Sequence, residues 1–270
     1  MIDLMTRVDP NRMPSGESAG VSIVVPCFNE ETGLFHLQKN LSDVRALLRQ
    51  EYEIQFILVD DGSTDDTWRL MKQLFGNETD VTVLHHSTNR GIGAAILTGI
   101  RQAHTEVVCS IDSDCSYNPR ELVNMIPMLT PGVDLVTASP YHPQGRVVNV
   151  PRWRLLLSKT ASWLYRLVLK RKLHTYTSCF RVYRRSAILK LELKREGFLG
   201  VAELIGKLDL QDSAVVEFPA TLASRVYGAS KMKTAQVLFG HVQLLCELFA
   251  AKLWQTVRPG RCASGNTNLI

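Results

Sequence analysis

The chain has 270 residues, of which 45% are hydrophobic, 31 are Lys or Arg and 26 are Asp or Glu. This composition allows a substantial buried core and excludes a chain that is disordered throughout. The formal charge of +5 suits attraction to phosphate groups or to an anionic bilayer, but it is too small to indicate nucleic-acid binding.

Residues 1–20 contain acidic residues, prolines and glycines and lack the continuous apolar stretch of a signal peptide, so we expect a flexible leader there. The six cysteines form no C-x-x-C pair, which indicates reduced thiols in a cytosolic protein and no zinc site. No stretch contains eighteen consecutive apolar residues, so we expect no transmembrane helix.

From Val21 onward, short apolar runs alternate with amphipathic stretches, a pattern that predicts a parallel sheet covered by helices. In chain order, the expected elements are strand 21–26, helix 34–50, strand 54–61, helix 65–75, strand 81–86, helix 91–103, strand 106–114, helix 120–129 and strand 134–139. This order is the beginning of a doubly wound α/β fold.

After Tyr141 the character of the chain changes. We expect a loop with Pro and Gly, a basic amphipathic helix over 153–172, a strand rich in Thr, Ser and Cys, and a second amphipathic helix near the end of the chain.

Two acidic clusters, Asp60-Asp61 and Asp112-Ser113-Asp114, directly follow apolar strands. Because open α/β sheets bind ligands at the carboxyl ends of their strands, both clusters should face one crevice. The D-x-D spacing lets two carboxylates approach one hard divalent cation, which can bridge a diphosphate. The alternative is that these aspartates only cap the turns that follow the strands.

A dinucleotide site is a weaker interpretation of Gly91-Ile92-Gly93, which precedes a helix and has Asp112 about twenty residues further on. The fingerprint normally follows its strand directly, whereas polar residues 85–90 intervene here.

Seven segments together carry a family resemblance: VSIVVPCFNEE, ILVDDGSTDDT, NRGIGAAILTGI, SIDSDCSYNP, RWRLLLSKTASWLYRLVL, TYTSCFRVYRRSAIL and SRVYGASKM. In this order they resemble the inverting glycosyltransferase family 2 and, within it, the dolichol-phosphate mannose synthases, from about Val21 to about Lys233. The resemblance implies a GT-A-type fold, with a nucleotide-sugar half at 21–140 and an acceptor half at 141–233.

The resemblance also assigns the donor site. It implies that Pro26, Phe28 and Glu30 border the nucleotide and that Asp60 and Asp61 hold its base or ribose. It further implies that a Mg²⁺ or Mn²⁺ ion is surrounded by Asp112, Asp114 and Ser116, with Asp114 in the catalytic set.

For the acceptor, the resemblance assigns the diphosphate and the acceptor phosphate to Arg154, Arg225 and Lys231, the last two in a mobile loop. Their charge suits phosphate independently of the resemblance. Glu203 falls where family-2 enzymes with hydroxyl acceptors keep a carboxylate base. Pro140 is a departure, because these synthases usually carry an Arg there; Arg146 or Arg152 compensates, or the acceptor differs.

In the helix expected from Trp153, an apolar stripe is bordered by basic residues, an arrangement suited to lying among lipid headgroups. The alternative is that the stripe packs on the sheet. The C-terminal helix at 234–257 has the same ambiguity and could instead meet a membrane-anchoring partner subunit; residues 258–270 are expected to form a flexible tail. The predicted location is the cytoplasmic face of a membrane.

These observations predict an enzyme that transfers a sugar from a nucleotide-diphospho-sugar to a polyprenyl phosphate by single displacement with inversion. GDP and mannose are favoured by resemblance only. Two alternatives stay open: a family-2 enzyme with a hydroxyl acceptor on a lipid, glycan or small molecule, using Glu203 as base, and a non-catalytic nucleotide-sugar-binding scaffold at a membrane.

Overall fold

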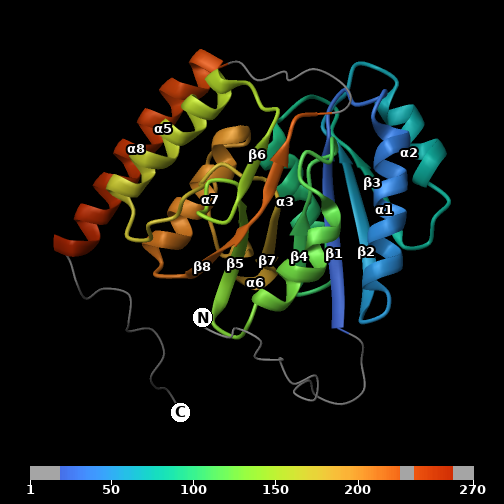
Figure 1. The fold of residues 1–270 in the computed structure, drawn as a ribbon, viewed down its shortest axis with the longest axis horizontal. Helices are drawn as coiled ribbons and strands as arrows, with labels where there is room; N and C mark the ends of the chain where they lie inside the picture. The colour runs from blue at the N-terminus through green and yellow to red at the C-terminus, as the bar shows by residue number, and fades with distance from the viewer. Residues whose placement is uncertain (1–18, 226–233, 258–270) are drawn as a thin grey trace, which may run out of the picture.

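The computed structural model describes residues 19–225 and 234–257. Its main sheet contains seven strands: β1 (Ala19–Cys27), β2 (Tyr52–Asp60), β3 (Val81–His85), β4 (Val107–Ser110), β5 (Val133–Ser139), β7 (Arg181–Arg184) and β8 (Ala214–Pro219). Their order across the sheet is β3-β2-β1-β4-β7-β5-β8 (Figure 1). A second, two-stranded sheet pairs β6 (Arg146–Val148) with β9 (Thr221–Ala223).

Helices cover both faces of the main sheet (Figure 1). The α-helices are α1 (Leu34–Leu48), α2 (Thr67–Phe75), α3 (Ile92–Gln102), α4 (Leu122–Met125), α5 (Arg152–Val168), α6 (Arg185–Leu189), α7 (Phe198–Leu210) and α8 (Thr234–Val257). Alternate residues of β1 face two separate cores: Ile23 and Val25 join the core beneath α1 and α2, whereas Val24 joins the core shared by α3, α7 and α8. Buried on both faces, the strand reads as a continuous apolar run.

The predicted fold class is confirmed. β1 pairs in parallel with β2 and β4, and β2 pairs in parallel with β3, which is the doubly wound start that the sequence indicates. β7 is antiparallel to both β4 and β5, between which it lies. Because β7 and β8 complete the sheet, the two halves expected at 21–140 and 141–233 share one sheet.

Two predicted elements are wrong. The helix expected at 120–129 consists of α4 between two 3₁₀ turns, Pro119–Glu121 and Ile126–Met128, since Pro127 has no N–H to continue an α-helix. The stretch rich in Thr, Ser and Cys at 175–180 is irregular, and the strand follows it as β7.

The helix predicted over 153–172 ends at Val168. The backbone N–H groups of Lys170 and Arg171 donate instead to the carboxylate of Asp209, at 2.8 and 2.7 Å, and this turns the chain away from the helix axis.

α5 and α8 lie side by side as the outermost layer of the molecule (Figure 1), and α8 also packs on α7. Within residues 19–225 and 234–257, no helix combines the length and the apolar character needed to cross a bilayer.

Candidate functional site

The loops after β1 and β2 are tied to each other at the carboxyl edge of the sheet. The backbone N–H of Asn29 donates to the Ser63 hydroxyl at 2.8 Å, and that of Glu30 donates to the Thr67 hydroxyl at 2.7 Å. In return, the Asn29 side-chain oxygen accepts from the Thr64 N–H at 2.7 Å. These bonds hold the Glu30 carboxylate at the sheet edge, beside Pro26 and Phe28 in the chain.

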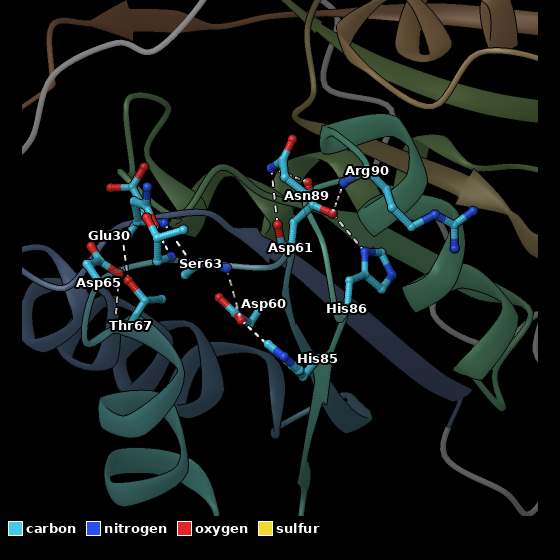
Figure 2. Close-up of polar contacts among 12 residues, drawn as sticks. Glu30, Asp60, Asp61, Ser63, Asp65, Thr67, His85, His86, Asn89 and Arg90 are labelled. Carbon is cyan, nitrogen blue, oxygen red and sulfur yellow. Dashed lines mark hydrogen bonds and ion pairs between the residues drawn. The ribbon is translucent and has the colours of Figure 1, made fainter.

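Asp60 and Asp61 are buried, and their carboxylates bind partners within the chain (Figure 2). Asp60 lies 2.7 Å from His85 Nδ1, and the ring of His85 stacks on Trp68. Asp61 lies 2.7 Å from His86 Nδ1 and accepts from the Asn89 side chain at 3.0 Å. The base- or ribose-holding role of the two aspartates stays a prediction.

Asp61 also organises the glycine loop before α3. It accepts the backbone N–H groups of Arg90 at 3.0 Å and Gly91 at 2.6 Å. Gly91 has φ +96°, and a Cβ atom there would lie 2.6 Å from the Cα of Gly197, so only glycine fits. The loop therefore directs N–H groups at an internal carboxylate, which argues against the dinucleotide interpretation, in which such groups face a pyrophosphate.

Asp112 and Asp114 lie on a tight turn after β4. The N–H of Cys115, a residue with φ +52°, donates to the Asp112 carbonyl oxygen, and the N–H of Ser116 donates to Asp114 Oδ1 at 2.9 Å. Burial, and secondarily the neighbouring Asp114 carboxylate, raise the pKa of Asp112 to about 7. Burial is therefore the main influence on the pKa of Asp112, and the second carboxylate of the turn adds to it.

β9 delivers Arg225 to this turn. The Ala223 N–H donates to the Ser116 carbonyl oxygen at 2.9 Å, which fixes the chain just before Arg225. Arg225 Nε then lies 2.5 Å from Asp114 Oδ2, and its terminal nitrogen lies 3.2 Å from Glu30 Oε1. One guanidinium therefore links the loop after β1 with the turn after β4.

A cavity of about 470 Å³ opens beside these residues. Its lining brings together five of the predicted site residues: Asp112, Asp114, Ser116, Arg154 and Arg225. Arg154 comes from the first turn of α5, with its guanidinium over the ring of Trp153. Pro140 lines the cavity too, but neither Arg146 nor Arg152 does.

The other predicted residues lie elsewhere. The residues assigned to the nucleotide, namely Pro26, Phe28, Glu30, Asp60 and Asp61, do not line this cavity. They follow or end the neighbouring strands β1 and β2. Lys231 lies outside the described residues.

Glu203 is not brought to the cavity. Its side chain is 1% exposed within α7 and accepts the backbone N–H groups of Lys194 at 3.1 Å and Arg195 at 2.8 Å. Lys207, one turn further along the helix, lies 3.2 Å away. With its oxygens already bonded, Glu203 anchors the segment that precedes α7, and this geometry argues against the role of base.

The donor set at the turn fits a hard divalent cation such as Mg²⁺ or Mn²⁺. Asp112, Asp114 and Ser116 offer carboxylate and hydroxyl oxygens, the ligands that these ions prefer. In the described part of the chain, no group of three or more His, Cys, Asp and Glu residues surrounds a common point. The ligand set of the ion would therefore be completed by oxygens from outside the protein, as is usual for Mg²⁺ sites that also bind substrate phosphates.

Sequence reasoning missed other residues of the cavity lining, namely Thr175, Thr177 and Ser178 after α5, Phe198 of α7 and His241 of α8. The one available indication was a histidine inside an apolar helical stripe. Its place in the cavity depends on how α8 packs, which no local pattern reveals.

Comparisons with known proteins identify a matching family and two similar curated proteins. Residues 22–191 match the family described as Glycosyl transferase family 2. The chain is 32% identical over 224 residues to a polyprenol monophosphomannose synthase of Mycolicibacterium smegmatis, covering 80% of this chain and 82% of that protein. It is 31% identical over 215 residues to a dolichol-phosphate mannosyltransferase of Pyrococcus furiosus, covering 79% of this chain but only 59% of that longer protein.

Solved structures share the fold. A glucosyl-3-phosphoglycerate synthase of Mycobacterium tuberculosis, in complex with Mn²⁺, UDP and its product, superposes with a TM-score of 0.62 at 19% identity, over 86% of this chain and 80% of that one. A mannosyltransferase of Pyrobaculum calidifontis, in complex with GDP-mannose and Mn²⁺, superposes with a TM-score of 0.57 at 19% identity. The superposition covers 89% of this chain and 65% of that one.

Proposed function

The chain belongs to glycosyltransferase family 2, and we propose that it transfers mannose from GDP-mannose to a polyprenyl phosphate with inversion at the anomeric carbon. The observation that carries the proposal is the convergence of two carboxylates, Asp112 and Asp114, with two guanidinium groups, Arg154 and Arg225, in one cavity. Mannose, GDP and the lipid acceptor are supported by the names of the two curated relatives and by the ligand of the Pyrobaculum enzyme.

The donor nucleotide is assigned to the carboxyl ends of β1 and β2, beside Pro26, Phe28 and Glu30. Asp60 and Asp61 belong to the same edge, where their bonds to His85 and His86 keep the loops in place. The diphosphate then reaches the turn after β4. A bound Mg²⁺ or Mn²⁺, held by Asp112, Asp114 and Ser116, would supply positive charge beside the diphosphate.

In the reaction, an oxygen of the acceptor phosphate forms the new bond to the anomeric carbon. The bond from that carbon to the diphosphate breaks on the opposite side, and its electron pair leaves with GDP. Arg154 and Arg225 orient the acceptor phosphate and balance its charge, and Lys231 is assigned to the same task. A phosphate monoester has a second pKa near about 6 and is already anionic, so this reaction needs no base. The position of Glu203 supports this acceptor over a hydroxyl acceptor.

The lipid part of the acceptor is assigned to the outer face of α5 and α8. Each helix exposes large apolar residues at the same spacing: Trp153, Leu156, Trp163 and Leu167 on α5, and Phe239, Val242, Phe249 and Leu253 on α8. The exposed cations of Arg152, Lys159 and Lys170 border the first set. An apolar face with Trp and basic neighbours suits the surface of an anionic bilayer, so we assign the protein to the cytoplasmic face of a membrane. A membrane-anchoring subunit on this face is the alternative partner.

The test is transfer of labelled mannose from GDP-mannose to a short-chain polyprenyl phosphate in detergent with Mg²⁺ or Mn²⁺, with UDP-glucose as the second donor. The expected result is a lipid-linked product from GDP-mannose. Asp114→Asn should lower the rate by about a thousandfold, because a charge beside the diphosphate is worth several kcal/mol and each 1.4 kcal/mol is tenfold.

The matched control is Asp43→Asn, a half-buried aspartate of α1 that pairs with Arg120 and lies outside the cavity lining, which should leave transfer unchanged. Hydrolysis of the donor without lipid-linked product would contradict the proposed acceptor, and transfer from UDP-glucose alone would contradict the proposed donor.

A further inference from the structure

Among the residues of α8 whose side chains are described, His241 is the one in the cavity lining, and no role has been assigned to it so far. It is 4% exposed, yet it is part of the cavity lining, together with Ala161 of α5 and Phe198 of α7. The charged residues of the same lining are Asp112, Asp114, Arg154 and Arg225.

Close packing of α8 on α7 explains how His241 reaches so far inward. A Cβ atom on Gly240 would lie 2.1 Å from Cδ1 of Leu199, so the missing side chain lets the two helices approach. The next residue, His241, is thereby carried between α5 and α7.

A hydrogen bond orients the His241 ring. Its Nδ1 lies 2.8 Å from the hydroxyl of Tyr165, a buried residue of α5 whose own ring stacks on Tyr176. Within the described residues, the Tyr165 hydroxyl forms no other hydrogen bond. The hydroxyl therefore donates to Nδ1, because otherwise its buried proton would have no acceptor.

The proton of the neutral imidazole consequently resides on Nε2. Burial lowers the pKa of His241 to about 4, so the ring is neutral at physiological pH. Nε2 forms no hydrogen bond with the described residues. The ring thus offers one fixed, uncharged N–H donor to whatever fills the cavity.

Three occupants could meet this donor. A hydrocarbon chain would leave the N–H without an acceptor, which is costly in a buried site. The acceptor phosphate is served by Arg154 and Arg225, and Arg154 lies seven residues before Ala161 on α5, about 10 Å along the helix axis. The remaining occupant is a neutral polyol, such as the transferred sugar, which lies between the donor diphosphate and the acceptor phosphate during transfer and offers neutral hydroxyl oxygens to this donor.

We propose that His241 donates an Nε2–H hydrogen bond to a hydroxyl oxygen of the transferred sugar and so contributes to the choice of sugar. The proposal rests on the proposed function, because it takes the sugar to be part of a nucleotide-diphospho-sugar. It makes α8 part of the donor-sugar site as well as of the apolar outer face.

The test compares the affinities for GDP-mannose and for GDP, measured calorimetrically with Mn²⁺ in the full-length wild-type protein and two variants. His241→Met removes the donor at similar side-chain length, whereas His241→Gln retains an N–H. His241→Met should weaken the binding of GDP-mannose by about tenfold, the effect of losing one buried hydrogen bond, and should leave the affinity for GDP unchanged. His241→Gln should recover most of the loss.

Deoxy analogues of GDP-mannose, each lacking one hydroxyl group of the sugar, identify the hydroxyl that His241 contacts. For the wild type, one deoxy donor should bind about tenfold more weakly than GDP-mannose, and in His241→Met the same deoxy donor and GDP-mannose should bind alike. Equal losses of GDP and GDP-mannose affinity in His241→Met would overturn the assignment. A raised KM for the polyprenyl phosphate with an unchanged GDP-mannose-to-GDP ratio would overturn it too, in favour of an acceptor contact.

Folding is checked by thermal unfolding, with His104→Gln as the control, since His104 is exposed and is not part of the cavity lining. If His241→Met does not fold, His241→Gln and Tyr165→Phe carry the test, because loss of the Tyr165 hydroxyl frees the imidazole tautomer and should reduce sugar discrimination. A wild-type protein that binds no GDP-mannose would overturn the proposed function together with this inference. Normal wild-type binding with unaltered discrimination in all three variants would overturn the inference alone.

Discussion

The edge formed by β1, β2 and β3 and the cavity beside α5 use buried polar groups in opposite ways. At the edge, Asp61 accepts bonds from the loop that follows β3, so its carboxylate is saturated by its own chain. In the cavity, Asp112 has a raised pKa and His241 keeps a nitrogen without a hydrogen-bond partner among the described residues. Asp61 therefore stabilises the loop that follows β3, whereas the cavity leaves Nε2 of His241 available to a ligand.

The largest expected effect is a difference in the free energy of unfolding between variants of Asp61, at the edge, and Asp112, in the cavity. Asp61→Ala should lower the free energy of unfolding by about 3 kcal/mol, because this buried carboxylate accepts hydrogen bonds from Arg90, Gly91 and Asn89 that would all be lost. Asp112→Asn should change it by less than about 1 kcal/mol, because burial disfavours the charged form of this carboxyl. Urea unfolding followed by circular dichroism measures both. Equal losses of unfolding free energy in the two variants would contradict the difference between the edge and the cavity.

A smaller effect concerns the pH dependence of stability at His241. Its pKa is about 4 in the folded protein and ordinary in the unfolded chain, so the unfolded state binds the additional proton as the pH falls below about 6.5. The contribution of the neutral His241 to the free energy of unfolding should therefore be fully present above about pH 6.5 and should decrease as the pH falls toward 4. At pH 5, the wild type should have lost about 2 kcal/mol more than His241→Gln, relative to pH 7.5.

The comparison between wild type and variant isolates this proton from other titrations. The groups around His241 are Tyr165 of α5, which binds it, and Arg195 and Glu203, whose charges act on Tyr165. All three are retained in His241→Gln. Parallel stability curves from pH 7.5 to 5 would show that His241 is not held neutral by burial.

The smallest effect concerns the outer face. Trp163→Ala should weaken binding to vesicles containing anionic lipid by about tenfold, because the buried area of one aromatic side chain is lost. The melting temperature should stay the same, since the Trp163 side chain is 59% exposed. Phe35→Ala, equally exposed on α1, is the matched control. If both variants bind vesicles like the wild type, the apolar face faces a protein partner instead.

Several features could be predicted before any coordinates. The apolar runs of β1 and β2 and the aspartates directly after them predict a parallel sheet with acidic residues at one edge, because the carboxyl ends of parallel strands meet there. Arg154 and Arg225 were also identified, although only by family resemblance. The same resemblance gave Glu203 the role of base, and the geometry argues against that role, since Lys194, Arg195 and Lys207 already contact its carboxylate.

The sequence by itself predicted the first five strands in chain order, the doubly wound beginning of the fold and the acidic edge, because these follow from local periodicity and from residues adjacent in the chain. Only the tertiary structure decided that Asp61 is saturated, that Arg225 links Glu30 to Asp114, and that His241 enters the cavity. Each of these depends on contacts between segments far apart in the chain, and their distances are set by how whole helices and loops pack rather than by any local pattern.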